Sequence, residues 1–196
     1  SIITRLGVKS SFIPENKDQS IESLFTSSYE ISTPSKNLVA YIEDKIGDKE
    51  LTSVVKSANK DMLSEYLWGK DILDLLTIDP NYQFNIDDIL SNLKSLQHRA
   101  YSISSSPKKY PDSIHMTISA VRWNNNDRTH LGVCSSYLSD RVIESKSVKM
   151  FVSPNKSFRV PEDGQTPMIM VGPGTGIAPF RAFLDEREMS KAKGEN

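Results

Sequence analysis

The first half of the chain has the hydrophobic periodicity of α-helices. Leu38 and Ile42 recur four residues apart, which places them on one face of a helix. Thr33 is the predicted N-cap of this helix, Pro34 its first residue, and Gly47 its stop signal. The pattern therefore predicts an amphipathic helix that ends at a glycine.

Three further stretches continue this helical half. "DKELTSVVKSANKDMLSEYLWG" predicts one or two helices that end at Gly69, and "KDILDLLTIDP" predicts a short helix that stops before Pro80. "NIDDILSNLKSL" predicts one more, with Asn85 or Asp87 as its cap. Its inward face is expected to comprise Ile86, Ile89, Leu90 and Leu93.

After Leu96 the pattern changes to the alternation that is typical of strands. "RAYSISSSP" and "SIHMTISAVRWN" are predicted strands, because they alternate and are rich in β-branched and aromatic residues. "VKMFVSPNKSFRVP" predicts a strand, a turn at Pro154–Asn155 and a short strand closed by Pro161. The apolar run Met168–Val171 predicts a buried parallel strand, followed by a glycine loop and a helix that starts near Ile177. One such βα unit needs others to pair with, so we expect this sequence to be part of a longer protein.

Composition and charge narrow the functional classes. The chain has 24 Lys and Arg against 25 Asp and Glu, which argues against nucleic acid or an anionic membrane as a partner. A single cysteine, Cys134, excludes an intrachain disulfide and fits a reducing compartment. No apolar run reaches bilayer length, and the first residues lack the pattern of a signal peptide. These features favour a cytoplasmic chain.

The stretch "VGPGTGIAPF" has the features of a phosphate-binding loop. Gly172, Gly174 and Gly176 allow a close backbone approach, Thr175 adds a hydroxyl, and a helix start follows. The match to the dinucleotide fingerprint is imperfect, since Pro179 stands where the third glycine would be. Taken alone, the motif fits a phosphate loop and a plain Gly/Pro turn equally well.

Two other stretches bear on this choice. "RAYSISSS" combines a guanidinium, an aromatic ring and a hydroxyl at Arg99, Tyr101 and Ser102. "LGVCSSYLSDR" places small residues before a helical pattern, as at an anion-binding helix start. In isolation each has a simpler interpretation: a half-buried strand with a surface arginine, and an ordinary Ser-capped helix.

Together, "RAYSISSS", "LGVCSSYLSDRV", "NKSFRVP" and "VGPGTGIAPFRAFLDER" resemble the FAD- and NADPH-binding part of diflavin reductases, in the order found there. This family includes sulfite reductase flavoproteins and NADPH–cytochrome reductases, and "APFRAFLDER" is closer to the former. The resemblance implies an α+β fold. A helical connecting domain (1–96) would be inserted in an antiparallel FAD-binding β-barrel (portion 97–162), followed by the start of a Rossmann-like α/β NADP-binding domain (163–196).

The resemblance also implies roles for individual residues. Arg99 would hold the FAD diphosphate, Tyr101 would stack on the isoalloxazine ring, and Ser102, the catalytic candidate, would lie beside flavin N5. Trp123 would be a further stacking residue, and Thr175 would contact the NADPH diphosphate. The cofactor-binding set expected from the resemblance is Arg99, Ala100, Tyr101, Ser102, Thr117, Ile118, Ser119, Trp123, Gly132, Val133, Cys134, Ser135, Gly174, Thr175 and Gly176.

The activity implied is hydride transfer from NADPH to FAD, followed by single-electron transfer to FMN on a domain that this chain lacks and then to a haem protein. One alternative is an NADPH–cytochrome reductase of the same family. Another is a helical protein-docking domain with vestigial nucleotide loops. His98, His115 and His130 lack the spacing of metal ligands, so no metal site is expected, and Cys134 is expected to have a packing role.

Overall fold

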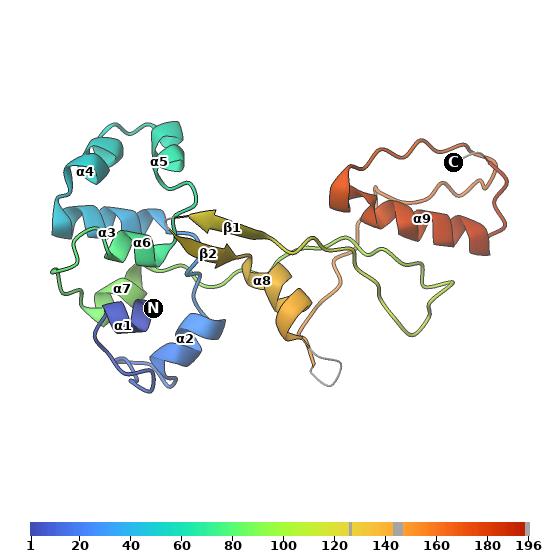
Figure 1. Ribbon diagram of the computed structural model, residues 1–196. Coiled ribbons are helices and arrows are strands. Elements are labelled where there is room, and N and C mark those ends of the chain that lie inside the picture. The colour runs from blue at the N-terminus through green and yellow to red at the C-terminus, as the bar shows by residue number, and fades with distance from the viewer. Residues whose placement is uncertain (126, 143–146, 195–196) are drawn as a thin grey trace. The chain divides into compact units, whose positions relative to one another are not determined.

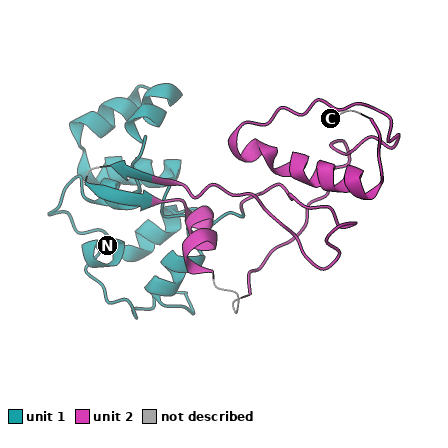
Figure 2. Cartoon of the chain, turned by 45° about the vertical axis from the view of Figure 1, so that its right-hand side comes forward, with its two compact units in different colours: residues 1–98, 123–130 teal, residues 99–122, 131–196 magenta. Residues whose placement is uncertain are grey.

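The computed structural model describes residues 1–125, 127–142 and 147–194. Within them the chain forms two compact units, which Figure 2 shows in teal and magenta. Unit 1 comprises residues 1–98 and 123–130, and unit 2 comprises residues 99–122 and the described part of 131–196. Helices dominate the first unit, whereas the second consists largely of extended segments and one long helix (Figure 1).

Unit 1 contains seven helices among the described residues. They are α1 (Ile2–Arg5), α2 (Ile21–Ser27), α3 (Lys36–Ile46), α4 (Lys49–Lys56), α5 (Lys60–Tyr66), α6 (Ile72–Leu76) and α7 (Ile86–Asn92). The helical character predicted from Leu38 to Leu93 is confirmed, whereas α1 and α2 were not predicted. Both are short, and their apolar faces become recognisable only once they pack on the core.

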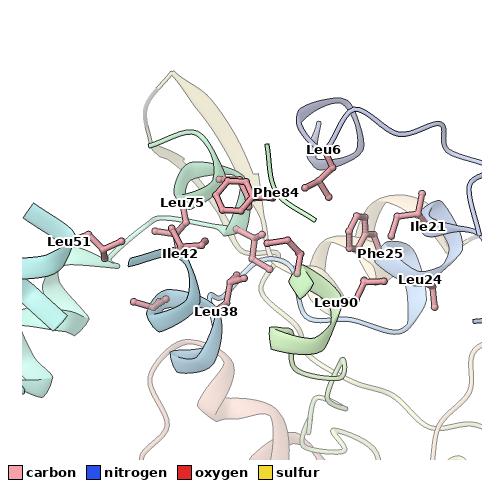
Figure 3. Packing of buried hydrophobic residues seen from close by; sticks show 14 residues of the cluster. Leu6, Ile21, Leu24, Phe25, Leu38, Ile42, Leu51, Leu75, Phe84 and Leu90 are labelled. Atoms are coloured by element: carbon pink, nitrogen blue, oxygen red, sulfur yellow. The ribbon is translucent and has the colours of Figure 1, made fainter. Parts of the chain in front are cut away.

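The core of unit 1 lies where α3, α6 and α7 meet. Leu38, Ile42, Leu75 and Ile89 are fully buried there. Phe84 belongs to the same cluster, part of which Figure 3 shows. Ile86 and Leu93 are half-buried against the same cluster, so the predicted inward face of α7 is confirmed.

Local signals set most helix ends. Gly47 adopts a left-handed conformation (φ 63°) after α3, and the side chain of Asn85 accepts two backbone N–H bonds at the start of α7. The predicted start of α3 was wrong by two residues. Ser35, not Thr33, is the N-cap, because its hydroxyl accepts from the N–H of Leu38 at 3.0 Å and donates to the carbonyl of Asn92 at 2.5 Å.

The strand predictions are confirmed only in part. The described residues form one two-stranded sheet, from β1 (Arg122–Asn125) and β2 (Arg128–Leu131), and two isolated bridges, Ile103–Met116 and Tyr29–Ser95. The rest of the predicted strand segments form no paired strand within these residues. A strand is stable only when its backbone groups find a neighbouring strand, and the alternating pattern does not supply that neighbour.

Unit 2 contains two helices among its described residues. α8 (Val133–Ser136) continues into a π-helical turn at Tyr137–Arg141, and α9 (Ala178–Met189) follows a 3₁₀ turn at Gly174–Ile177. Phe180 and Phe183 of α9 pack around Phe158, with the rings of Phe158 and Phe183 centred 5.1 Å apart. Within unit 2, this aromatic cluster fixes the apolar side of α9.

Candidate functional site

The "RAYS" segment is joined to the start of α8 through one contact. Tyr101 is half-buried, and burial together with a hydrogen bond to the Cys134 side chain raises the pKa of its phenol to about 12, while the charge of Arg99 acts in the opposite direction. The structure thus brings Arg99, Tyr101 and Cys134 together. Ala100 and Ser102 are exposed on the same segment.

The small residues of "LGVCSSYLSDR" close a tight loop. Gly132 donates its N–H to the carbonyl of Val121 at 2.9 Å, and Val121 donates its own N–H to Ser135 Oγ at 3.2 Å. A Cβ atom at Gly132 would lie 2.5 Å from Ser135 Oγ, so only glycine fits. Val133 is half-buried beside this loop. The sequence placed small residues here, and the structure explains why one must be glycine.

The segment at 117–119 is linked to α9. Thr117 accepts a hydrogen bond from Arg181 at 2.8 Å, and both residues belong to unit 2. Ile118 is half-buried and Ser119 is exposed. Sequence reasoning did not find Arg181 as a partner of Thr117, because 64 positions separate them.

The glycine loop has a compact backbone and an exposed rim. Gly174 has a φ of 56°, and the N–H of Gly176 donates to the carbonyl of Pro173 at 3.0 Å. A Cβ atom at Gly172 would lie 2.5 Å from the carbonyl oxygen of Gly176, so the loop folds tightly onto itself. Thr175 is exposed. The predicted loop followed by a helix is confirmed.

The predicted strand before this loop is wrong. Residues 168–171 form no strand, and Ile169 and Val171 are 95% and 81% exposed. A parallel strand is held by hydrogen bonds to neighbouring strands, and no other described segment pairs with this one. The apolar run therefore predicted a buried segment, whereas Ile169 and Val171 are exposed among the described residues.

Trp123 belongs to unit 1, unlike the other site candidates. Its ring stacks on His130 with centroids 5.1 Å apart and an interplanar angle of 17°. Trp123 Nε1 and His130 Nε2 are buried and have no hydrogen-bond partner among the described residues. The predicted stacking residue is thus already in contact with an imidazole.

An ionic cluster lies beside this stack. The guanidinium of Arg128 lies 2.9 Å from Asp71 and 2.7 Å from Asp74, and His130 Nδ1 lies 3.4 Å from Asp71. Burial alone would raise the pKa of Asp74, but the backbone N–H of Asp71 and the Arg128 guanidinium outweigh it and hold that pKa below its usual range. The bonds to Asp71 and Asp74 in turn raise the pKa of Arg128.

Asp71, Asp74 and His130 could each offer a ligand atom to a cation. Arg128 pairs with both carboxylates and offsets one of their two negative charges from within the protein. Sequence reasoning missed the cluster. The Asp-x-x-Asp spacing of the capping box at the start of α6 is the one part of the cluster that could be recognised in the sequence. Arg128 and His130 could not be linked to it, because they lie on a distant strand.

No helix in the described part of the chain is both long and apolar enough to cross a membrane.

Comparisons with known proteins point to one family. The family described as "FAD binding domain" matches residues 8–137. The chain is 39% identical, over 93% of its length, to the sulfite reductase (NADPH) flavoprotein alpha-component of Vibrio parahaemolyticus, and 37% identical, over 86%, to that of Bacillus subtilis. The chain covers 29% and 28% of these two relatives, so it spans less than a third of their length.

A third relative, from Mannheimia succiniciproducens, carries the same name and is 42% identical over 76% of the chain, which covers 24% of that protein. These matches confirm the resemblance stated from the four motifs. They also extend it into the helical half, where the sequence offered only helicity and position.

Proposed function

Since the chain belongs to the family of FAD-binding domains, we propose that it forms the FAD-binding part of an NADPH-dependent reductase of the sulfite reductase flavoprotein type. The observation that carries the proposal is the hydrogen bond between Tyr101 and Cys134 in unit 2, beside the closed Gly132 loop, with Arg99 near enough for its charge to act on the Tyr101 phenol. The names of the relatives favour this type over a cytochrome reductase.

The residues present in unit 2 fit such a cofactor. The Gly132 loop is tightly folded, because Ser135 and Val121 fill the space beside its first residue, and its small residues would line the FAD diphosphate. Arg99 offers a planar, multidentate cation suited to the same group. Tyr101 offers an aromatic face, and its raised pKa keeps the phenol neutral.

When bound, FAD would supply hydride acceptance from NADPH and release of single electrons to an FMN domain and a haem-protein acceptor. Ser102 would orient the reacting edge of the ring through its exposed hydroxyl. Residues 117–119 would contact FAD through the backbone, and the loop Gly174–Gly176 would hold the NADPH diphosphate at the start of α9.

On this proposal residues 1–96 form the connecting domain, 97–162 contribute to an antiparallel FAD-binding barrel, and 163–196 begin a Rossmann-like domain. The extended segments of unit 2 would be the barrel's strands, which need partners to form ladders.

The test measures the affinity for FAD, which is monitored by the absorbance of the bound flavin and by the quenching of its fluorescence. We expect Arg99→Ala to weaken FAD binding by about tenfold or more, the size of a lost charge-assisted contact. Lys56→Ala, which removes an exposed cation from the last turn of α4, is the matched control and should leave FAD affinity unchanged. Equal affinity in both variants would argue against the proposed diphosphate site.

Protein docking by unit 1 is a second candidate. Trp68 follows α5 and is 85% exposed, beside the acidic side chains of Asp61 and Glu65. A large exposed aromatic ring is typical of binding surfaces. Trp68→Ala should then weaken the association of the reductase with its haem-protein partner without changing FAD content.

A further inference from the structure

α9 is attached near both ends to the segment that follows the "RAYS" motif. Near its start, Arg181 donates to Thr117 Oγ1 at 2.8 Å. In its last two turns, Asp185 and Glu188 lie 2.9 Å and 2.6 Å from the ammonium of Lys109. The contacts at Arg181 and Glu188 are about two turns apart along the helix, and together they restrain its tilt and rotation more than one contact would.

A second lysine strengthens the attachment at the end of α9. The ammonium of Lys108 lies 2.6 Å from Glu186 and 3.1 Å from the hydroxyl of Ser190. Ser106, which is 2% exposed, donates its hydroxyl to the other carboxylate oxygen of Glu186. Burial alone would raise the pKa of Glu186, but Lys108 and Ser106 outweigh it and lower that pKa, as expected for a satisfied carboxylate.

The backbone holds both lysines in place. The N–H groups of Lys109 and Tyr110 donate to the carbonyl of Ser106 at 3.1 Å and 2.9 Å, and the N–H of Lys108 donates to Ser106 Oγ at 3.1 Å. The chain segments before and after this turn are joined by a hydrogen bond in which the N–H of Ser104 donates to the carbonyl of His115 at 2.8 Å. The lysines thus project from an ordered turn, so less conformational entropy is lost on pairing.

We propose that Lys108 and Lys109 are positioning residues that clamp α9 to the segment 104–117 and thereby fix the glycine loop Gly174–Gly176. The loop leads directly into α9, so any rotation of the helix moves the loop. The same segment carries Thr117, one of the residues assigned to FAD. The clamp therefore sets the position of the NADPH loop relative to the flavin segment, an inference that rests on the proposed function.

The strength of the clamp comes from its connectivity. An isolated surface ion pair contributes little to stability. Here two lysines pair with three carboxylates, and one of these carboxylates also accepts a hydrogen bond from a buried serine hydroxyl. The carboxylate side chains of Asp185 and Glu186 are only 19% and 27% exposed, which reduces their screening by salt.

The first experiment measures hydrogen–deuterium exchange in the unliganded chain. In the Lys108→Gln/Lys109→Gln variant, we expect the amides of 104–117 and of α9 to exchange about fivefold faster or more, the size expected from loss of such a network. The control is Lys149→Gln/Lys156→Gln, which removes two exposed lysines of the same unit. Unchanged exchange in the first variant would overturn the clamp.

A charge swap separates the ion pairs from the residues as such. Lys109→Glu should accelerate exchange in both segments, and adding Asp185→Lys with Glu188→Lys should restore protection. Failure of the triple variant to regain protection, with its circular dichroism unchanged, would overturn the ion-pair basis of the clamp.

The positioning role is measured with NADP⁺ as the probe, by calorimetry on the FAD-loaded protein. We expect the double glutamine variant to raise the Kd for NADP⁺ about fivefold or more, with FAD content unchanged. Faster exchange with an unchanged Kd would overturn the positioning role and leave a purely structural contact. A full-length wild-type protein that binds neither FAD nor NADP⁺ would instead overturn the proposed function, and the exchange data would still decide the clamp.

Discussion

The guanidinium of Arg128 lies 2.7 Å from a carboxylate oxygen of Asp74, and this contact joins β2 to the first turn of α6 within unit 1. Asp74 also completes the capping box of α6 by accepting the N–H of Asp71 at 2.8 Å. One carboxylate thus stabilises a helix start and holds a strand that comes later in the chain.

Loss of the Arg128 guanidinium should destabilise unit 1. Arg128→Met keeps the aliphatic stem but leaves Asp71 and Asp74 facing each other, and we expect a loss of about 1–2 kcal/mol in the free energy of unfolding. The control is Arg122→Met, whose partner Asp140 is 40% exposed, so that its loss should cost clearly less than the loss of Arg128. Urea unfolding followed by tryptophan fluorescence checks both, and equal losses would contradict the prediction.

The stabilisation by Asp74 should depend on pH. Its pKa in the folded protein lies below the ordinary value, so its contribution is present above about pH 4 and disappears as the pH falls through the folded-state pKa. The difference in unfolding free energy between wild type and Asp74→Asn should therefore be largest near neutral pH and shrink toward pH 3. Urea midpoints measured across this range test it; a constant difference would show that the carboxylate charge is not responsible.

Gly132 should not tolerate a side chain. A Cβ atom there would lie 2.9 Å from the Cβ of Val121 and closer still to Ser135, so we expect Gly132→Ala to cost about 1–3 kcal/mol through overpacking. Gly176→Ala is the matched control, because its nearest neighbour, Pro173 Cδ, is 3.8 Å away. Thermal unfolding should separate the two variants, and similar melting temperatures would mean that the loop relaxes to admit a methyl group.

Tyr101 should ionise later than an ordinary tyrosine. Its phenol is predicted to remain neutral at about pH 10.5, and Cys134→Ala should lower its pKa only in part, because burial is the larger cause and the hydrogen bond the smaller. NMR of tyrosines labelled at the ring carbon that bears the hydroxyl follows each group separately. Tyr41, whose pKa is also raised to about 12 by burial and by Asp88, should be unaffected by this substitution. Titration of wild-type Tyr101 near pH 10 would contradict the assignment.

The features that the sequence by itself determined are those whose physical cause lies within a few residues. Asn85 caps α7 through N–H groups two and three positions ahead, and Gly47 ends α3 because glycine adopts positive φ without strain. The glycine loop and α9 were predicted for the same reason. The four motifs also sufficed to identify the family, since each is a short run of neighbouring residues.

Features that depend on distant partners were decided only by the tertiary structure. Ser35 replaces Thr33 as the cap of α3 because its hydroxyl also reaches Asn92, 57 positions away. The predicted strand at 168–171 lacks a neighbour to pair with, so its apolar pattern alone could not form a ladder. Lys109 meets Asp185 across 76 positions. Local hydrogen bonds and backbone preferences can be predicted from neighbouring residues, but long-range pairs exist only after the fold has brought their segments together.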